Sequence, residues 1–333
     1  MNVLVGDIGG TKTALGVYAR TGTADYRIVG EKTYPSQEYA SLGDVLKQFL
    51  PTFGPQLTID MTVFSVAGPV VDGVCSTTNL PWVISERELS TQLGTRVALI
   101  NDFHAVVLGV RELPPSALHC VQKGNPDPHG VFAVLGAGTG LGEGIGVPLD
   151  DGRVRVLPSE GGHADFAPRN DIEDDLLRYL HARHERVSVE RVVSGLGLAT
   201  LYEFVVASGL APADPETLRR FERESHGAVM ADRMRQDPAA ARVLSLFVSA
   251  YGAEAGNLAL KVLPAGGVYV AGGIAARSIE QLDWVEFTRS FSDKGRMTQL
   301  LASIPIYVVR DLKVGLLGAR AYAALLWDSG RKA

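Results

Sequence analysis

The stretch VLVGDIGGTKTALGVYA, residues 3–19, decides the fold. Two strand-like apolar runs flank the glycine-rich turn GDIGGTKT, residues 6–13, and a third strand-like run follows near 26–34. Apolar runs separated by glycine and polar residues are typical of an antiparallel meander. The unit of strand, glycine turn and strand returns at 131–147, so the sequence predicts two related α/β halves.

Further strands and helices follow from hydrophobic spacing and from capping residues. Strands are expected at 61–67, 96–102 and 266–271. Helices are expected at 37–50, from Phe103, from Asn170 as its N-cap, and at 196–208, 214–236, 239–263 and 314–327. Within 239–263, Gly252 and Gly256 fall on one face, which predicts close packing against another backbone.

Composition limits the class of protein. The chain has 333 residues, 46% of them hydrophobic, and a formal net charge of −5. This length predicts about two domains. Because no long Lys/Arg-rich run occurs, neither nucleic acid nor an anionic membrane is expected as the main partner.

The cysteines and the apolar stretches indicate a compartment. Cys75 and Cys120 lie far apart and outside any metal-ligand spacing, which favours reduced thiols. The N-terminus lacks the basic and apolar regions of a secretory signal. The longest apolar stretch, 243–263, contains charged and amide residues and is expected to be a buried helix. We therefore expect a soluble, cytoplasmic protein.

The first glycine turn combines a carboxylate with potential anion-binding amides. Gly9 and Gly10 allow the backbone N–H groups of the turn to face a phosphate, and Asp7 can hold hydrated Mg²⁺. The turn is not a Walker A loop, because Thr11 precedes Lys12; we expect Lys12 to contact a phosphate. The alternative is a glycine hairpin that binds no ligand.

The second glycine turn, GAGTGLGEG at 136–144, also departs from the G-x-G-x-x-G spacing of dinucleotide-binding folds. We interpret Gly138, Thr139 and Gly140 as a second phosphate-binding turn. Two such turns, each between apolar strands, favour a nucleotide held between two related domains.

A third glycine pair occurs in VAGGIA, residues 270–275, where a strand turns into a helix. Gly272 and Gly273 can admit a purine or a ribose against the backbone. A tight turn without a ligand is the alternative.

The segment IND, residues 100–102, ends a predicted strand. Phosphoryl transfer to a hydroxyl requires a carboxylate near the attacking oxygen, and Asp102 is the candidate base. The alternative is that Asp102 only caps the helix that begins at Phe103.

The segment PSEGGHADFAP, residues 158–168, contains residue types that suit sugar hydroxyls. Glu160 and His163, with Glu190 and the amide of Asn101, can each fix hydroxyl groups, and the glycine pair 161–162 would let the loop approach a sugar ring. A metal site at His163 and ordinary surface positions are the alternatives.

In this order, the segments resemble the bacterial glucokinases of the hexokinase, Hsp70 and actin superfamily. The resemblance runs nearly end to end, and EGGHxDFAP followed by ERVxSGxGL is specific to this group. The matching segments are GDIGGTKTALGV (6–17), AGPVVDG (67–73), TTNLPW (77–82), LINDF (99–103), LGAGTGLG (135–142), EGGHADFAP (160–168), ERVVSGLGL (190–198), VYVAGGIAAR (268–277) and FSDKGRM (291–297).

The resemblance implies a duplicated ribonuclease-H-like, actin-like ATPase fold with two domains and an active-site cleft between them. The implied domains are 1–112 with 313–333, and 113–312. It further implies ATP and Mg²⁺, a homodimer, Asp102 as base, phosphates at the turns 7–12 and 138–140, adenosine beside 271–275, and glucose on Asn101, Asp102, Glu160, His163 and Glu190. No zinc is expected, because ADFAPRND after His163 contains no cysteine.

Three rival functions remain. A sugar-responsive regulator would carry a helix-turn-helix before the first glycine turn, and that turn already begins at residue 6. A filament-forming ATPase would leave the segments 160–168 and 190–198 unexplained. A kinase for another hexose, such as mannose or an amino sugar, remains open, because residue types do not define hydroxyl stereochemistry.

Overall fold

The structure is a computed structural model that describes residues 1–22, 25–77 and 79–330. Thr78, within the TTNLPW segment, and the last three residues of the segment 313–333 lie outside the described residues. Contacts divide the chain into two compact units: unit 1 contains Met1–Leu113 and Lys313–Ala333, and unit 2 contains Pro114–Leu312.

Unit 1 is built on a five-stranded sheet with the order β3-β2-β1-β4-β7. Strand β1 is antiparallel to β2 and parallel to β4, and β4 is parallel to β7, so the carboxyl ends of β1, β4 and β7 share one edge. A separate hairpin pairs β5 with β6. The strands are β1 (Asn2–Ile8), β2 (Lys12–Arg20), β3 (Tyr26–Pro35), β4 (Met61–Val66), β5 (Val74–Ser76), β6 (Val83–Ser85) and β7 (Val97–Asn101).

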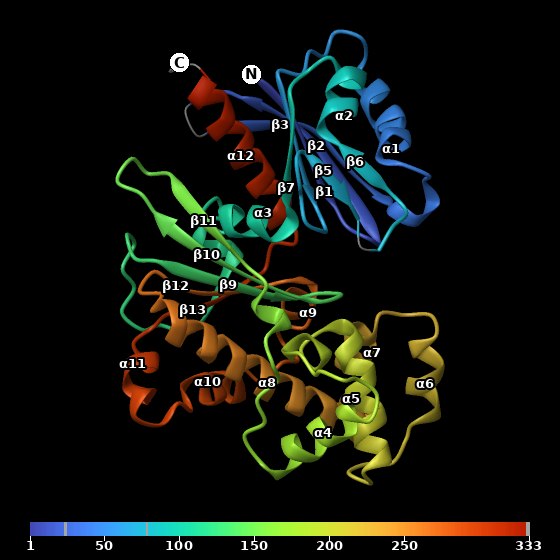
Figure 1. Ribbon diagram of the computed structural model, residues 1–333, viewed down its shortest axis with the longest axis vertical. Coiled ribbons are helices and arrows are strands. Elements are labelled where there is room, and N and C mark those ends of the chain that lie inside the picture. Colours follow the sequence, from blue (N-terminus) through green and yellow to red (C-terminus); the bar gives the residue numbers. More distant parts are fainter. Residues whose placement is uncertain (23–24, 78, 331–333) are drawn as a thin grey trace. The chain divides into compact units, whose positions relative to one another are not determined.

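Helices cover both faces of this sheet (Figure 1). Alternate residues of a strand point to opposite faces, and β1 is buried on both. Leu4 and Ile8 belong to the core beneath α1 (Leu42–Phe49) and α2 (Glu86–Leu93). Val3 and Val5 belong to the core beneath α3 (Asp102–Gly109) and α12 (Val314–Gly330).

The last helix, α12, packs against α3 backbone to backbone. A Cβ at Gly109 would lie 1.9 Å from the carbonyl oxygen of Val314, and one at Gly318 would lie 1.7 Å from that of Ala105. Only glycine fits at these two positions, so α12 closes one face of the sheet and fixes the position of α3.

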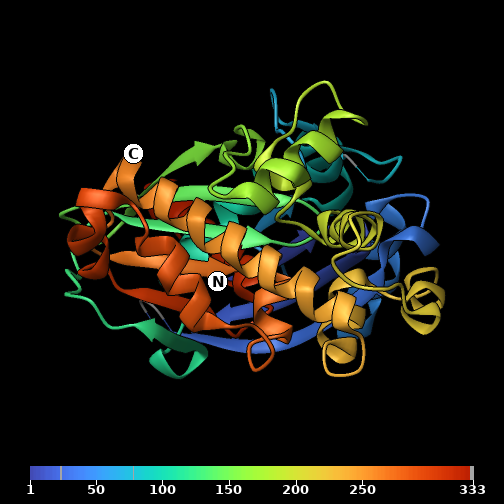
Figure 2. The same ribbon diagram turned by 90° about the horizontal axis from the view of Figure 1, so that it is seen from below.

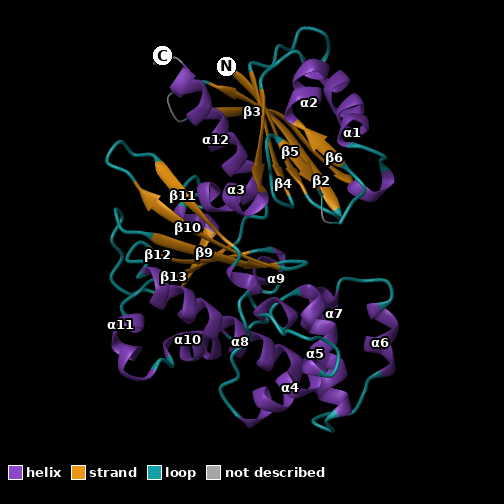
Figure 3. Cartoon of the chain, in the orientation of Figure 1, coloured by secondary structure: helices purple, strands orange, loops and turns teal. Residues whose placement is uncertain are grey.

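Unit 2 is built on a six-stranded sheet with the order β11-β10-β9-β12-β13-β8 (Figure 3). Strands β9, β10 and β11 form an antiparallel meander, and β9, β12 and β13 run parallel. Unit 1 has the same arrangement of a meander followed by two parallel strands. The strands are β8 (Leu118–Gln122), β9 (Phe132–Ala137), β10 (Leu141–Pro148), β11 (Val154–Ser159), β12 (Gly267–Ala271) and β13 (Ile306–Val309).

The long helix α8 (Pro238–Val262), orange in Figure 2, lies against this sheet with α10 (Trp284–Ser292) beside it. By length and composition α8 could span a membrane, but 78% of its most apolar window is buried inside the protein, as expected of a core helix. The other helices of unit 2 are α4 (Asp171–His181), α5 (Gly195–Ala207), α6 (Pro215–Phe221), α7 (His226–Arg233), α9 (Gly273–Arg277) and α11 (Thr298–Ala302).

The helix predicted over 214–236 is wrong as a single element. The structure has α6 and α7 with a break between them, and Arg233 Nη2 lies 2.6 Å from Asp214 Oδ2. A continuous helix would hold these two residues about 28 Å apart. The buried Asp237 also accepts hydrogen bonds from Tyr202 and Thr217. This polar cluster therefore favours folding the segment back on itself.

The predicted close packing at Gly252 and Gly256 is confirmed. A Cβ at either position would lie 2.3 Å from a backbone oxygen of α10, that of Phe287 or of Phe291. We expect Gly252→Ala to destabilise unit 2 by about 3 kcal/mol, because α10 must move to admit the methyl group. Thermal or urea unfolding measures the loss.

Gly227→Ala is the matched control for this prediction. Gly227 is also a helical glycine of unit 2, but its Cβ would meet the nearest side-chain atom at an ordinary 3.4 Å. Its replacement should be neutral or stabilise by up to about 1 kcal/mol. Equal effects of the two substitutions would contradict the packing argument.

Candidate active site

The first glycine turn follows β1 directly and is closed by short polar contacts. Gly9 N donates to the carbonyl of Lys12 at 3.0 Å, and Ser36 Oγ donates to the carbonyl of Gly9 at 2.8 Å. A Cβ at Gly10 would lie 2.5 Å from Cβ of Asn79, so this glycine is required by a close approach within the protein. Thr11 and Lys12 are exposed. The turn is thus held in one shape, with its tip open to solvent.

Asp7 lies near the carboxyl end of β1. Ser65 Oγ donates to Asp7 Oδ1 at 3.2 Å, and burial, opposed by the charge of Lys12 and by this hydrogen bond, raises the pKa of Asp7. A Cβ at Gly315 would lie 3.1 Å from Asp7 Oδ2, so the start of α12 reaches this carboxylate. Sequence reasoning missed Gly315, because the residue lies more than 300 positions away and belongs to no glycine pair.

Asp102 is the first residue of α3, at the carboxyl end of β7. Its Oδ1 accepts hydrogen bonds from Phe103 N at 2.9 Å and from Asn101 Nδ2 at 3.0 Å. Burial, and after it the negative charge of Asp7, raise the pKa of Asp102 to about 6, against these hydrogen bonds. A carboxyl group with this pKa is largely ionised at neutral pH and is a better proton acceptor than an ordinary aspartate.

The N-cap of α3 is Asn101, so the alternative that Asp102 only caps this helix is wrong. Asn101 Oδ1 accepts from Phe103 N at 2.9 Å and from His104 N at 3.2 Å. Its amide donates to Asp102 and, at 3.3 Å, to the carbonyl of Gly68. Asn101 therefore positions Asp102, a role that the sequence analysis missed. A contact from Asn101 to a sugar stays a prediction.

The second glycine turn, in unit 2, joins β9 to β10. Gly138 N donates to the carbonyl of Gly140, and the carbonyl of Gly138 accepts from Gly195 N, both at 2.8 Å. Thr139, between the two glycines, is exposed. The amide next to the turn, Leu141 N, donates to Glu190 Oε2 at 2.9 Å. The predicted sugar residue Glu190 thus also braces the predicted phosphate turn.

Three predicted sugar-binding residues lie together in unit 2. Glu160 precedes the 3₁₀ turn η4 (Gly161–His163), and Glu190 lies in η5 (Val189–Arg191). His163 Nε2 lies 3.9 Å from Glu160 Oε2, and His163 Nδ1 lies 3.9 Å from Glu190 Oε1. The side chains of Glu160, His163 and Glu190 are 86%, 58% and 30% exposed, so this cluster can reach a ligand.

The glycine pair of this loop serves the protein itself. A Cβ at Gly161 would lie 1.8 Å from Glu143 Oε2, and one at Gly162 would lie 2.0 Å from the carbonyl of Leu141. These glycines therefore let the loop lie on β10, and an approach of the loop to a sugar ring stays a prediction.

The third glycine pair has two different environments. Gly272 has φ of 88°, and a Cβ there would lie 2.4 Å from the carbonyl of Ala137, so a tight turn explains this glycine. Gly273 has only the Arg277 guanidinium near its Cβ position, at 3.9 Å. An adenosine contact at 271–275 stays a prediction.

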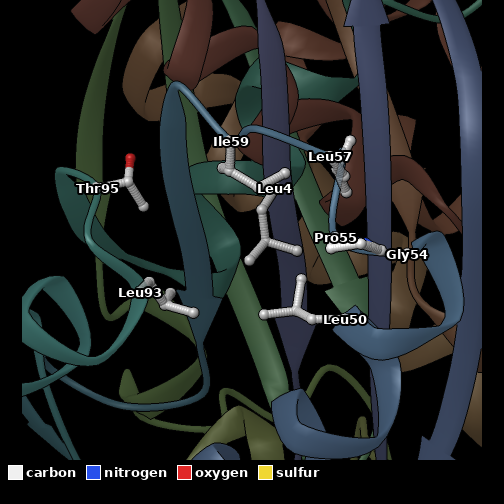
Figure 4. A pocket seen from close by; sticks show the side chains of 8 residues that line it. All are labelled: Leu4, Leu50, Gly54, Pro55, Leu57, Ile59, Leu93 and Thr95. Carbon is white, nitrogen blue, oxygen red and sulfur yellow. The ribbon is translucent and has the colours of Figure 1, made fainter.

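An apolar pocket of about 190 Å³ in unit 1 contains none of the predicted site residues (Figure 4). Its lining includes Leu4, Leu57 and Leu93, with Thr95 at one side. Leu4 lies in the first half of β1, whereas Asp7 lies near its carboxyl end. Among the described residues, no group of three or more His, Cys, Asp or Glu side chains is placed to hold a metal ion.

Comparison with known proteins defines the class. The fold is a mixed α/β fold similar to that of sugar kinases in the actin-like ATPase class. A solved glucokinase from an Antarctic psychrotroph superimposes with a TM-score of 0.81 at 29% identity, covering 97% of this chain and 98% of that one. The site residues described above, a half-buried aspartate and a cluster of two carboxylates and an imidazole, suit an enzyme of this class.

The sequence comparisons define the family. A family model described as Glucokinase matches residues 4–326. A glucokinase of Synechocystis sp. is 42% identical over 348 residues, covering 97% of this chain and 98% of the relative. A glucokinase of Nostoc punctiforme is 40% identical over 340 residues, covering 97% and 99%. The chain belongs to the glucokinase family.

Proposed function

We propose that the chain transfers the γ-phosphoryl group of ATP to the 6-hydroxyl of glucose, giving glucose 6-phosphate and ADP. The observation that carries the proposal is the carboxyl group of Asp102, held by Asn101 and with its pKa raised to about 6. The new bond joins the sugar O6 to phosphorus, the bond from phosphorus to the β-phosphate bridging oxygen breaks, and Asp102 takes the hydroxyl proton.

In this proposal Glu160, His163 and Glu190 bind the hydroxyl groups of glucose. Their convergence in unit 2 supports the assignment, because carboxylates accept from hydroxyl groups and an imidazole can donate or accept. The N–H groups of the turns at 9–12 and 138–140 stabilise negative charge on the phosphates.

The first glycine turn also fits Mg²⁺. This ion keeps several waters and needs few protein carboxylates when phosphates supply the other oxygens. Asp7 is the carboxylate that would hold it, through water. Bound there, Mg²⁺ would neutralise charge on the transferred phosphoryl group. A metal cage made of protein side chains alone is not what the described residues offer.

The proposal retains a duplicated ribonuclease-H-like fold. The shared strand order of the two sheets supports it. A cytoplasmic enzyme that acts in glycolysis as a homodimer is part of the same proposal, by analogy with the family. Neither nucleic acid nor a membrane is needed as a partner, and size-exclusion chromatography with light scattering tests the dimer.

The deciding experiment measures coupled ADP release with ATP and Mg²⁺ and with glucose, mannose, fructose, N-acetylglucosamine or no sugar. Release with glucose well above that with the other sugars is the expected result. Release with a different sugar would retain Asp102 as base and replace the substrate. Release that no sugar stimulates would contradict the kinase proposal.

A further inference from the structure

Two glutamates, Glu143 of β10 and Glu254 of α8, are buried together in unit 2. Their exposed fractions are 3% and 4%, and within the described residues the Oε1 atom of each has no hydrogen-bond partner. A buried carboxylate without a partner costs several kcal/mol, and two adjacent negative charges cost more. Two ionised carboxylates would therefore be unfavourable here, and the pair needs a hydrogen atom that one carboxyl group can donate to the other.

One proton shared between the two carboxyl groups supplies this donor. Burial, and after it the charge of Glu254, raise the pKa of Glu143 to about 8, whereas Lys261 lowers it; a hydrogen bond between the two carboxyl groups is a further cause of the increase. A carboxyl O–H that donates to the facing carboxylate satisfies both orphaned oxygens and leaves one negative charge instead of two.

The surrounding groups favour the negative charge on Glu254. Asn257 Nδ2 donates to Glu254 Oε2 at 2.9 Å, and Lys294 Nζ donates to Asn257 Oδ1 at 2.6 Å. The cation thus acts on Glu254 through one amide. Among the described residues, no side-chain donor reaches Glu143 Oε1, so the proton belongs on Glu143.

Of the other charged and titratable groups near the pair, Arg169 is engaged elsewhere, Tyr251 is neutral, and Lys261 acts on the pair only through its charge. Arg169 bonds Glu173 through two nitrogen atoms, at 2.5 and 3.1 Å. The hydroxyl of Tyr251 accepts from Ala137 N at 3.1 Å, and burial raises the pKa of Tyr251, so it stays neutral. Lys261, one turn beyond Asn257 on α8, attracts the charge of the pair without a hydrogen bond to it.

Glu143 also lies directly under the loop that carries Glu160 and His163. A Cβ at Gly161 would lie 1.8 Å from Glu143 Oε2, so the Gly161 backbone rests on this carboxyl group. Gly161 N donates to Ser159 Oγ at 3.0 Å, and Ser159 is the β11 residue paired with Glu143. The charge state of Glu143 is therefore coupled to the position of the loop.

We propose that Glu143 and Glu254 share one proton, and that neutral Glu143 is a positioning residue for the sugar-binding loop Glu160–His163. The role in sugar binding rests on the proposed function; the shared proton does not. When the proton is lost, two facing carboxylates repel each other and draw water between them, and η4 moves away from β10.

The experiment compares wild type with Glu143→Gln and Glu254→Gln over the neutral to alkaline range. For wild type we expect KM for glucose to rise about tenfold above pH 8, with kcat changed little, because the loop positions the sugar and not the base. Glu143→Gln keeps the shape and hydrogen-bond capacity of the neutral acid, so its KM should match wild type at neutral pH and stay flat. Glu254→Gln should abolish most of the rise, because an ionised Glu143 then faces a neutral amide instead of a second carboxylate.

A second readout is independent of catalysis. Infrared difference spectra should show the C=O stretch of a protonated carboxylic acid in wild type at neutral pH, which titrates away in alkali and is absent from Glu143→Gln. A Glu143→Gln protein that melts like wild type but retains the alkaline rise in KM would overturn the positioning role. Absence of the infrared band from wild type would overturn the shared proton. Absence of sugar phosphorylation with the band present would instead count against the proposed function.

Discussion

Asp102→Asn is expected to lower kcat by about 10³-fold while glucose still binds within about tenfold of wild type. The asparagine keeps the size of the side chain and an oxygen that can accept from Phe103 N, but it cannot take the hydroxyl proton. The coupled assay measures kcat, and isothermal titration calorimetry measures glucose binding.

Asp171→Asn is the control, because Asp171 is the first residue of α4 as Asp102 is of α3, and it is exposed. It should leave kcat unchanged. An Asp102→Asn enzyme with near-normal kcat would show that another group accepts the proton.

Asp102→Asn should also stabilise the protein at neutral and alkaline pH. Asp102 has a folded-state pKa of about 6, above the ordinary aspartate value of 3.8, so wild type loses stability as pH rises through 6 and the carboxyl group ionises. Asparagine does not ionise, and the gain should be roughly 1–3 kcal/mol above pH 7 and should vanish below about pH 4. Urea unfolding of the ligand-free protein across this range measures it, and a gain independent of pH would contradict the burial argument.

Glu190→Ala is expected to lower kcat/KM for glucose by about 10³-fold and also to raise KM for ATP. The carboxylate lies 2.9 Å from Leu141 N, and a Cβ at Gly140 would lie 2.2 Å from it, so truncation loosens the turn at 138–140 as well as removing the proposed sugar ligand. Initial rates with each substrate varied separately distinguish the two effects.

Glu160→Ala is the matched comparison for Glu190→Ala. Glu160 is 86% exposed and does not brace the glycine turn, so its loss should raise KM for glucose alone. Unfolding should likewise separate the two variants, since only Glu190→Ala leaves a backbone N–H without its acceptor. If both variants affected glucose and ATP alike, the bracing role of Glu190 would be wrong.

The parts of the fold that the sequence predicted correctly depend on residues that lie close together in the chain. The strands around Asp7 and the second glycine turn have the expected places, and Asn170 caps α4 as predicted, because such signals lie within a few residues of each other. Gly252 and Gly256 could be predicted for the same reason: a four-residue spacing defines one helix face. The predicted sugar residues of unit 2 also lie together, as the resemblance implied.

Long-range contacts could not be predicted in this way. The break between α6 and α7 depends on an ion pair between residues 19 positions apart, and the burial of Glu143 depends on a helix more than 100 positions away. Strand β11 and helix α10 were missed, although Asp283 caps α10 and Phe287 and Phe291 show its spacing. The sequence predicted that the glycines of the loop at 160–163 allow a close approach. It could not show that the approaching groups are Glu143 and Leu141.

Unit 1 is assembled from the two ends of the chain, with all of unit 2 inserted between them. On a ribosome, unit 2 is therefore complete before unit 1, whose sheet waits with Val3 and Val5 uncovered until Leu316 and Ala319 of α12 are made. The residue that reaches Asp7, Gly315, belongs to the same late segment. Catalytic competence thus requires synthesis of the segment that begins at Lys313, and a nascent chain without that segment has neither a finished core in unit 1 nor a finished environment for Asp7.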